Sequence, residues 1–533
     1  MLKSILILFT LFITSINYAQ SKPKLIVGIV VDQMRYDFLF KYEKKYGNGG
    51  FKRLIKEGFQ CRNNHFNYVP TYTGPGHASI YTGTVPAIHG IIANNWYVRD
   101  GDKMIYCAED NTVQTVGTEG KAGFMSPRNM LTTSICDQLR IAQNFKSKTI
   151  GIALKDRGAI LPAGHTANAA YWFDGKSGNW ISSTYYFNQL PKWVQDFNNQ
   201  KWPQKYIAND WKTLLPIASY TESTSDTNTW EDQLKGESLP IFPHILKKEN
   251  TESIRTSPFG NSLTKDFAKA AILADSLGKG NTTDFLAVSF SSTDYVGHAF
   301  GPNSIEVEDT YIRLDKDLEE FLLFLDKEIG INQYTVFLTA DHGVADVPGF
   351  AKNNKLPGDI LDIDDLDKSM DSALIKSFGA GKWILNHDND QIFLNKPLLK
   401  EKNMELQKAI SIVEEVLKNH SGIQFVVNLT QLDRAAIPSL LKERIINGYN
   451  QKRSGEIQYI TEAGWIAHGK RGTTHGSAWN YDTHVPLLFF GHGIKKGQTL
   501  ERTSISDIAP TIANLLNIIA PSGSIGQIIP VGN

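Results

Sequence analysis

The chain has 533 residues, of which 41% are hydrophobic, so it is long enough to bury a large core. Its 55 Lys and Arg residues balance 55 Asp and Glu residues, which gives a formal net charge of zero. This balance argues against a protein that binds nucleic acid through a basic surface, and no acidic tail is present. The length permits one large catalytic domain with insertions, or two domains.

The N-terminus has the pattern of a secretory signal peptide. Lys3 precedes an apolar run over residues 5–13, and Ala19 supplies a small residue at a cleavage position. This run is too short to span a bilayer comfortably, and no later segment is apolar for long enough to form a transmembrane helix. We therefore predict a signal peptide over residues 1–19 and a periplasmic or secreted mature chain. An uncleaved membrane anchor is the alternative interpretation.

Short, nearly continuous apolar runs predict buried β-strands in the mature chain. Helical patterns lie between them, for example from Phe267 to Leu277 and from Ile312 to Leu325. This alternation predicts an α/β fold with a mostly parallel central sheet flanked by helices. The predicted strands cover residues 25–31, 149–154, 285–290, 335–340 and 485–490.

Two stretches differ from this pattern and predict inserted cap segments. Residues 346–470 are rich in turn-forming residues and contain a predicted helix over 404–417 and a predicted strand over 423–427. Residues from about 160 to 260 are rich in Trp, Tyr, Asn and Pro. We therefore predict one catalytic domain over residues 20–533 with insertions at about 160–260 and 346–470. A last helix over 505–516 is expected to pack on the core.

The three cysteines, Cys61, Cys107 and Cys136, do not form a metal motif, because no C-x-x-C spacing is present. Their odd number allows at most one internal disulfide in an oxidising compartment. We interpret them as structural and assign no pairing.

Polar residues follow four of the five predicted strands. Each alone is more often a turn residue, a helix cap or a surface charge. In an open parallel sheet, however, ligands bind beyond the carboxyl ends of the strands, so these side chains are expected to converge. Asp and neutral His are ligand types that Zn²⁺ accepts. The residues concerned are Asp32, Lys155, Asp156, Arg157, Asp294, His298, Asp341 and His342.

Thr73 is the candidate nucleophile. It lies in a glycine-rich segment that permits close backbone approach, and a helix is expected to begin near Gly76. A helix N-terminus favours an anion, although a Thr at such a place is more often a simple N-cap. Because a Thr hydroxyl is a weak nucleophile, it needs a metal to become an alkoxide. This requirement connects Thr73 with the Asp and His residues.

Several motifs, together with their order along the chain, resemble the alkaline phosphatase superfamily and its phosphodiesterase/nucleotide-pyrophosphatase-like branch. Within that branch, the similarity is greatest to the phosphate-insensitive, monomeric alkaline phosphatases. The resemblance spans the mature chain, and the set is specific although each motif alone is weak. The motifs are residues 30–35 (VVDQMR), 70–83, 86–90 with 94–96, 155–157 (KDR), 294–298 (DYVGH), 340–343 (ADHG), 472–476 (GTTHG) and 507–511 (DIAPT).

The resemblance implies two Zn²⁺ per chain, and a further Ca²⁺ or Mg²⁺ site stays open. One site would use Asp294, His298 and His475. The other would use Asp32, Asp341 and His342, with Thr73 as a further ligand and the nucleophile. His475 is assigned only through its Thr-Thr-His-Gly context, since the chain has 13 histidines. Others are interpreted as structural, including His77, His89, His244, His420 and His484.

Three further residues match those that contact phosphoryl oxygens in the monoesterase members: Asn94, Lys155 and Arg157. A phosphate monoester carries more charged oxygens than a diester, so the two cations favour monoesters. The resemblance thus implies a monomeric, secreted alkaline phosphatase that acts on small phosphate monoesters through a phosphothreonine intermediate. An alkaline pH optimum is expected, because high pH favours the deprotonated nucleophile.

Other functions stay open at this point. A phosphodiesterase or nucleotide pyrophosphatase on the same scaffold is the main alternative, and Lys155 with Arg157 argues against it. A sulfatase would need a Cys/Ser-x-Pro-x-Arg motif, which the Thr73 segment lacks. A phosphoglycerate mutase does not fit the predicted export. A surface protein that binds phosphate or glycan without catalysis is a further class, which the complete ligand set disfavours.

Overall fold

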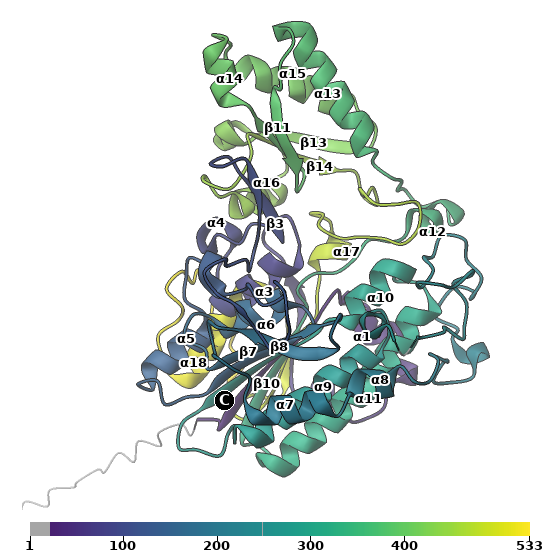
Figure 1. Cartoon of the computed structure of the whole chain (residues 1–533), viewed down its shortest axis with the longest axis vertical. Coiled ribbons are helices and arrows are strands. Elements are labelled where there is room, and N and C mark those ends of the chain that lie inside the picture. Colours follow the sequence, from purple (N-terminus) through teal and green to yellow (C-terminus); the bar gives the residue numbers. More distant parts are fainter. Residues whose placement is uncertain (1–21, 248, 533) are drawn as a thin grey trace, which may run out of the picture.

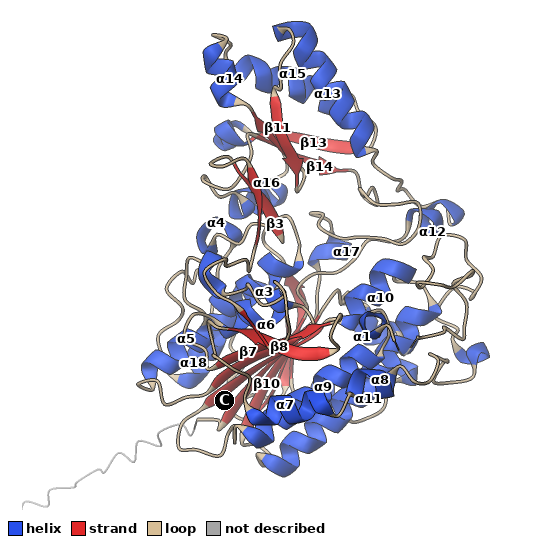
Figure 2. Ribbon diagram, viewed as in Figure 1, coloured by secondary structure: helices blue, strands red, loops and turns tan. Residues whose placement is uncertain are grey.

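A ten-stranded sheet forms the centre of the molecule in a computed structural model, which describes residues 22–247 and 249–532 (Figure 1). The predicted signal peptide lies outside the described residues. Figure 2 shows helices on either side of the sheet, which confirms the α/β class. Among the described residues, no helix is both long and apolar enough to cross a membrane. The strand order is β16-β2-β15-β10-β1-β9-β6-β7-β8-β5.

The middle of the sheet is parallel and fully buried. Strand β1 pairs in parallel with β9 and β10, and β6 extends this parallel group from β9. Their carboxyl ends therefore meet at one edge of the sheet, where ligands bind in such folds. All five predicted strands form, within one or two residues of the expected bounds. They are β1 (Leu25–Val31), β6 (Thr149–Ala153), β9 (Asp284–Phe290), β10 (Tyr334–Thr339) and β15 (Leu487–Gly491).

The flanks of the sheet are mixed. Strand β15 is antiparallel to both β10 and β2, and β8 is antiparallel to β7 and β5. Two of these strands, β7 and β8, fall within the stretch from about 160 to 260, so the main sheet continues into that stretch. The flanking strands are β2 (Phe59–His65), β5 (Thr115–Val116), β7 (Ala169–Asp174), β8 (Asn179–Ser183) and β16 (Gly497–Ser504).

Helix α3 (Thr73–Thr82) begins earlier than expected, at Thr73 instead of near Gly76. The expectation was wrong because the first turn of a helix tolerates proline, whose missing N–H would have no partner there. Pro75 therefore fits inside this helix. Gly76 is required by close packing instead, since a Cβ there would lie 2.3 Å from the carbonyl oxygen of Asp341. The close approach holds α3 against the end of β10.

The other helices of the main body surround the sheet. Two match the helical patterns of the sequence: α9 (Phe259–Ala274) and α11 (Ile305–Glu328). The last helix, α18 (Ile508–Leu516), follows a 3₁₀ turn over Ile505–Asp507 and is largely buried, as expected. The remaining ones are α1 (Phe38–Lys41), α2 (Phe51–Glu57), α4 (Pro86–His89), α5 (Ile135–Ala142), α6 (Asp156–Ala163), α7 (Lys192–Asn199), α8 (Trp202–Tyr206), α10 (Ser292–Phe300), α12 (Pro348–Asn353) and α17 (Asn480–Thr483).

A second sheet with its own apolar core forms a cap at one end of the molecule (green in Figure 1). Its strand order is β11-β12-β14-β13, and its core includes buried Trp383 and Tyr459. A short hairpin of β3 (Asn95–Val98) and β4 (Lys103–Tyr106) is separate from both sheets. The cap elements are α13 (Ile363–Phe378), β11 (Ile384–Asp388), β12 (Gln391–Leu394), α14 (Lys396–Glu401), α15 (Leu406–Lys418), β13 (Ile423–Asn428), α16 (Ser439–Gly448) and β14 (Ile457–Thr461).

Candidate metal centre and active site

The carboxyl ends of the four parallel strands bring the candidate residues together. Asp32 follows β1, and Lys155 follows β6 at the start of α6. Asp294 lies in the first turn of α10, directly after β9, and Asp341 with His342 follows β10. All five side chains are buried. The convergence expected from the strand order is therefore present.

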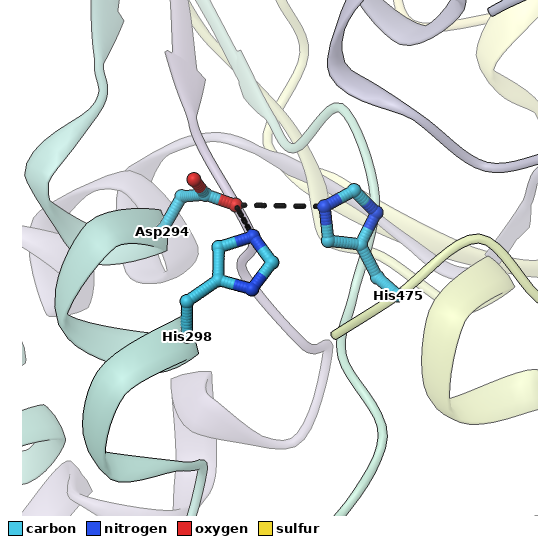
Figure 3. A group of neighbouring side chains, drawn as sticks. All are labelled: Asp294, His298 and His475. Carbon is cyan, nitrogen blue, oxygen red and sulfur yellow. Dashed lines mark ion pairs between the residues drawn. The ribbon is translucent and has the colours of Figure 1, made fainter. Parts of the chain in front are cut away.

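Asp294, His298 and His475 form the first group of possible metal ligands (Figure 3). Asp294 Oδ1 lies 3.2 Å from His298 Nε2 and 3.7 Å from His475 Nε2. The spacing of four residues places Asp294 and His298 on one face of α10. The other ring nitrogens donate to backbone carbonyls, Nδ1 of His298 to Thr473 and Nδ1 of His475 to Thr71, each at 2.7 Å. These bonds orient both Nε2 atoms for metal binding.

The second group is centred on His342. Its Nε2 lies 3.5 Å from Asp32 Oδ1, 3.5 Å from Asp341 Oδ2 and 4.0 Å from Asp294 Oδ1. The possible ligand atoms of Asp32, Asp294 and His342 all lie within 4.8 Å of one another, so Asp294 is shared between the two groups. The ring of His342 stacks on that of His475 with centroids 3.4 Å apart. The two groups are therefore adjacent parts of one centre.

The unsatisfied carboxylate oxygens of this centre fit bound metal ions. Asp32 Oδ1 and Asp341 Oδ2 are buried and have no hydrogen-bond partner in the described part of the chain. A buried carboxylate oxygen without a partner is costly, whereas a divalent cation would satisfy several at once. The donor set of carboxylates and imidazoles suits ions such as Zn²⁺. The residues present thus fit metal ions in both groups.

The ionisation of the centre reflects the crowding of its carboxylates. Burial and the neighbouring Asp294 raise the pKa of Asp32 to about 6, and burial and Asp32 raise the pKa of Asp341 well above its usual range. Burial opposes ionisation of Asp294 too, but His298 and Lys155 hold its pKa well below normal. Burial and His298 lower the pKa of His475 to about 3. A neutral imidazole is the form that binds metal.

Thr73 Oγ1 faces this centre from the first residue of α3. It lies 3.3 Å from His342 Nε2 and accepts a hydrogen bond of 3.4 Å from Lys155 Nζ. The same ammonium lies 2.7 Å from Asp32 Oδ2 and 2.5 Å from Asp294 Oδ2. Burial opposes the charge on Lys155, yet these two carboxylates raise its pKa above the ordinary value. A hydroxyl, a cation and the possible metal ligands therefore meet at one point.

Asn94 and Arg157 are positioned by different contacts. The Asn94 side-chain oxygen accepts a hydrogen bond of 2.8 Å from the Gly74 amide, which leaves its Nδ2 group for another acceptor. Arg157 Nη1 donates to the Tyr106 hydroxyl at 3.1 Å, and that hydroxyl donates to Asp156. Within the described residues, no hydrogen bond joins Arg157 to Thr73. Asn94 thus lies beside the nucleophile, whereas Arg157 is held by Tyr106, the last residue of β4.

Two supporting residues were not assigned a part in the site from the sequence. Gln33 Nε2 donates to Asp294 Oδ1 at 3.0 Å, and the Gln33 amide donates to Asp341 Oδ1 at 3.1 Å. Its φ of +63°, unusual for a residue other than glycine, aims the amide this way. His77, interpreted as structural, donates from Nδ1 to the Thr73 carbonyl at 2.9 Å and contacts Ser289 Oγ at 2.9 Å. The only signal for Gln33 in the sequence is its position directly after Asp32.

The cysteines take no part in this centre. Cys61, Cys107 and Cys136 are buried free thiols. Burial is the largest effect on each and raises the pKa of Cys61 and Cys107 to about 12. A protonated, buried thiol is neither a nucleophile nor a metal ligand, which agrees with their structural interpretation.

Known proteins are similar in sequence to this chain over nearly its whole length. The model of the type I phosphodiesterase/nucleotide pyrophosphatase family matches residues 26–486. The chain is 50% identical over 513 residues to alkaline phosphatase PhoV of Synechococcus elongatus, covering 96% of this chain and 92% of PhoV. A protein from Myroides odoratus named calcium-transporting ATPase is also 50% identical over 513 residues, covering 95% of this chain and 94% of that protein.

A solved structure matches the whole fold. Alkaline phosphatase PafA of Elizabethkingia meningoseptica is 48% identical over 516 residues, which cover 96% of this chain and 94% of PafA. The PafA crystal structure superposes with a TM-score of 0.94 and covers 96% of this chain and 99% of that chain. The two chains therefore share the architecture of sheet, helices and cap.

Proposed function

The chain belongs to the type I phosphodiesterase/nucleotide pyrophosphatase family, and we propose that it is an exported alkaline phosphatase. It hydrolyses small phosphate monoesters and releases inorganic phosphate. Two relatives at 50% and 48% identity over nearly the whole chain carry the name alkaline phosphatase, which supports this activity. The main structural support is the position of Thr73 Oγ1, which lies 3.4 Å from Lys155 Nζ and 3.3 Å from His342 Nε2.

The metal ions of the proposed enzyme are two Zn²⁺. Asp294, His298 and His475 would hold one, and Asp32, Asp341 and His342 would hold the other, with Thr73 as an additional ligand. Bound there, Zn²⁺ would lower the pKa of the Thr73 hydroxyl and stabilise negative charge on the phosphoryl and leaving oxygens. Asp294 Oδ1 is within 4.0 Å of His342 Nε2 as well, so its carboxylate is able to connect the two sites.

The protein residues carry out an in-line displacement in two steps. Thr73 Oγ1 gives up its proton and attacks phosphorus; the bond from phosphorus to the leaving oxygen breaks, and the alcohol departs with a proton. Water then attacks the phosphothreonine from the side that the alcohol left, which releases phosphate and regenerates Thr73. His77 holds the Thr73 carbonyl, so the first turn of α3 stays fixed during both displacements. Asn94 and Lys155 donate to phosphoryl oxygens.

The positive charge beside Thr73 supports a monoesterase over a diesterase. A monoester presents up to three charged non-bridging oxygens and a diester one. Charge-assisted hydrogen bonds from the protein therefore stabilise a bound monoester more than a bound diester. Lys155 is buried, and its ammonium lies 2.7 Å from Asp32 Oδ2 and 2.5 Å from Asp294 Oδ2. Metal ions on those carboxylates would compete with the ammonium and free it for the phosphoryl group.

A direct comparison of substrates tests the proposal. Purified, zinc-loaded protein would be assayed on an aryl phosphate and on its methyl diester under the same conditions. We expect a higher kcat/KM for the monoester. A clear preference for the diester would replace the proposal with a phosphodiesterase on the same scaffold.

A further inference from the structure

A small cavity of about 90 Å³ lies beside the centre, between the cap and the loop that carries His475. The main body contributes Tyr72, which precedes Thr73, and the segment around His475. The cap contributes Asp390, in the turn between β11 and β12, and Trp465, which follows β14. The cavity is therefore closed on one side by a possible metal ligand and on the other by the cap.

The polar lining of this cavity is acidic. Asp482 is fully buried, and its Oδ2 accepts hydrogen bonds from the amides of Gly476 at 3.1 Å and Ser477 at 2.7 Å. Its Oδ1 has no hydrogen-bond partner within the described ranges. Asp390 supplies a second carboxylate, half-buried in the same wall. The lining contains no Lys or Arg in the part of the chain that the structure describes.

Both carboxylates lie in the same wall as an aromatic ring, since Asp390, Asp482 and Tyr72 all line the cavity. Burial raises the pKa of Asp390 to about 6 and that of Asp482 to about 7. At alkaline pH both carboxylates are therefore ionised and give the cavity a negative charge.

The aromatic side chains are held in place by glycines. A Cβ at Gly476 would lie 2.6 Å from Tyr72 Cε1, so the Tyr72 ring packs directly on that backbone. A Cβ at Gly422 would lie 2.3 Å from Trp465 Cε3, and the Trp465 ring is fixed in the same way. Fixed aromatic rings together with carboxylates form the environment that recognises an alkylammonium group, through cation–π attraction and charge.

The cavity borders the centre through His475, one of the possible metal ligands. Thr73 contacts His342 of one ligand group, whereas His475, which lines the cavity, belongs to the other. In an in-line displacement the leaving oxygen lies opposite the nucleophile. A monoester has a single organic group, attached to the leaving oxygen, and this cavity adjoins the centre at which that group would be bound.

We propose that this cavity binds a cationic leaving group, so that the preferred substrates are phosphate monoesters of small amino alcohols. The inference rests on the proposed phosphatase function and specifies its substrate class. The bound group is an alkylammonium that pairs with Asp390 and Asp482 and contacts Tyr72 and Trp465. A neutral polyol would gain hydrogen bonds here but no charge–charge attraction to the two carboxylates.

The test compares two isosteric monoesters, 2-aminoethyl phosphate and propyl phosphate, which differ by the ammonium. We would measure kcat/KM for both with the zinc-loaded wild type, with Asp390→Asn and with the control Asp364→Asn. Asp390 has a φ of +58°, a conformation that Asn also tolerates, so this isosteric change is compatible with the fold. Asp364 is an exposed carboxylate of the same cap, in the first turn of α13.

We expect the ratio of kcat/KM for the aminoethyl ester over the propyl ester to fall by about tenfold in Asp390→Asn. The ratio should stay at the wild-type value in Asp364→Asn. The intrinsic reactivities of the two esters cancel, because each variant is compared with the wild type on the same pair. Trp465→Leu should lower the same ratio by removing one aromatic face.

Three results would overturn the inference. An unchanged kcat/KM ratio of the two esters in both Asp390→Asn and Trp465→Leu would show that the cavity does not bind the ammonium group. A higher kcat/KM for glycerol phosphate than for 2-aminoethyl phosphate would assign the cavity to a polyol. If none of the monoesters is hydrolysed, the proposed phosphatase function fails as well, so the two failures are distinguishable.

Discussion

Replacing Lys155 with Ala should separate two effects that this side chain has on the protein. Its ammonium is buried and contacts Asp32 Oδ2, Asp294 Oδ2 and Thr73 Oγ1 at 2.7, 2.5 and 3.4 Å. Without bound metal it would neutralise these carboxylates, and in the zinc-loaded enzyme it is expected to bind the phosphoryl group. The variant should therefore lose stability without metal and lose activity with it.

The expected magnitudes follow from these contacts. Removing one partner of a buried ion pair costs about 3–5 kcal/mol, so the free energy of unfolding of the metal-free variant should fall by that amount. The difference should shrink when Zn²⁺ is bound, because the metal ions then neutralise the same carboxylates. A hydrogen bond to a charged group contributes about 1.5–3 kcal/mol, so kcat/KM for an aryl phosphate should fall by about 10- to 150-fold.

Denaturant unfolding with and without Zn²⁺, together with kcat/KM for an aryl phosphate and its methyl diester, measures both effects. The loss should be smaller for the diester, so the ratio of monoester to diester activity should fall by about tenfold. Lys192→Ala is a suitable control, because that side chain is 86% exposed and lies in α7, which contributes to neither ligand group. An unchanged ratio in Lys155→Ala would show that the ammonium does not bind the phosphoryl group.

Further predictions concern the nucleophile, the metals, the buried acid and the N-terminus. Thr73→Ala should abolish monoester hydrolysis while Thr73→Ser retains part of it; full activity of the Ala variant in a steady-state assay would remove Thr73 from the reaction. Removal of metal with EDTA should abolish activity and lower the melting temperature, and added Zn²⁺ should restore both. Burial raises the pKa of Asp482 from 3.8 in the unfolded chain to about 7 in the folded chain. The protonated carboxyl therefore contributes its full stability below the unfolded pKa, and this contribution is lost as the pH rises to about 7. The unfolding free energy of the wild type should thus fall relative to Asp482→Asn between pH 5 and 7, by up to about 1.4 kcal/mol per pH unit, and stay level above pH 7; parallel curves over that range would contradict the assignment. N-terminal sequencing of exported protein should find a start after Ala19, and an intact Lys3 would support an anchor instead.

The parts of the fold that depend on local pattern were predicted well from the sequence. Strands such as β1 and β9 are buried on both faces, so their apolar runs are unambiguous. Asp32 and Asp294 follow those strands, and parallel pairing alone brings them to one edge. Local pattern was misleading at Thr73, where Gly74, Pro75 and Gly76 suggested a loop although the helix has already begun.

Contacts between distant segments could not be predicted in this way. His475 follows no strand and reaches the centre from a loop after the cap, so only family resemblance identified it. Tyr106, which orients Arg157, comes from a hairpin outside both sheets, and its hydroxyl contact depends on how that hairpin packs. Asp482 looks like an ordinary polar residue in the sequence, and only the structure shows its unpaired oxygen beside Tyr72.

Thr73 is expected to be phosphorylated during the hydrolysis of a phosphate monoester. Rapid acid quenching of zinc-loaded enzyme during turnover, followed by peptide mass spectrometry, would detect this intermediate. We expect one phosphoryl group on Thr73 in the wild type and none at that position in Thr73→Ala. Monoester hydrolysis that proceeds with Thr73 unmodified at every quench time, and that continues in Thr73→Ala, would contradict it.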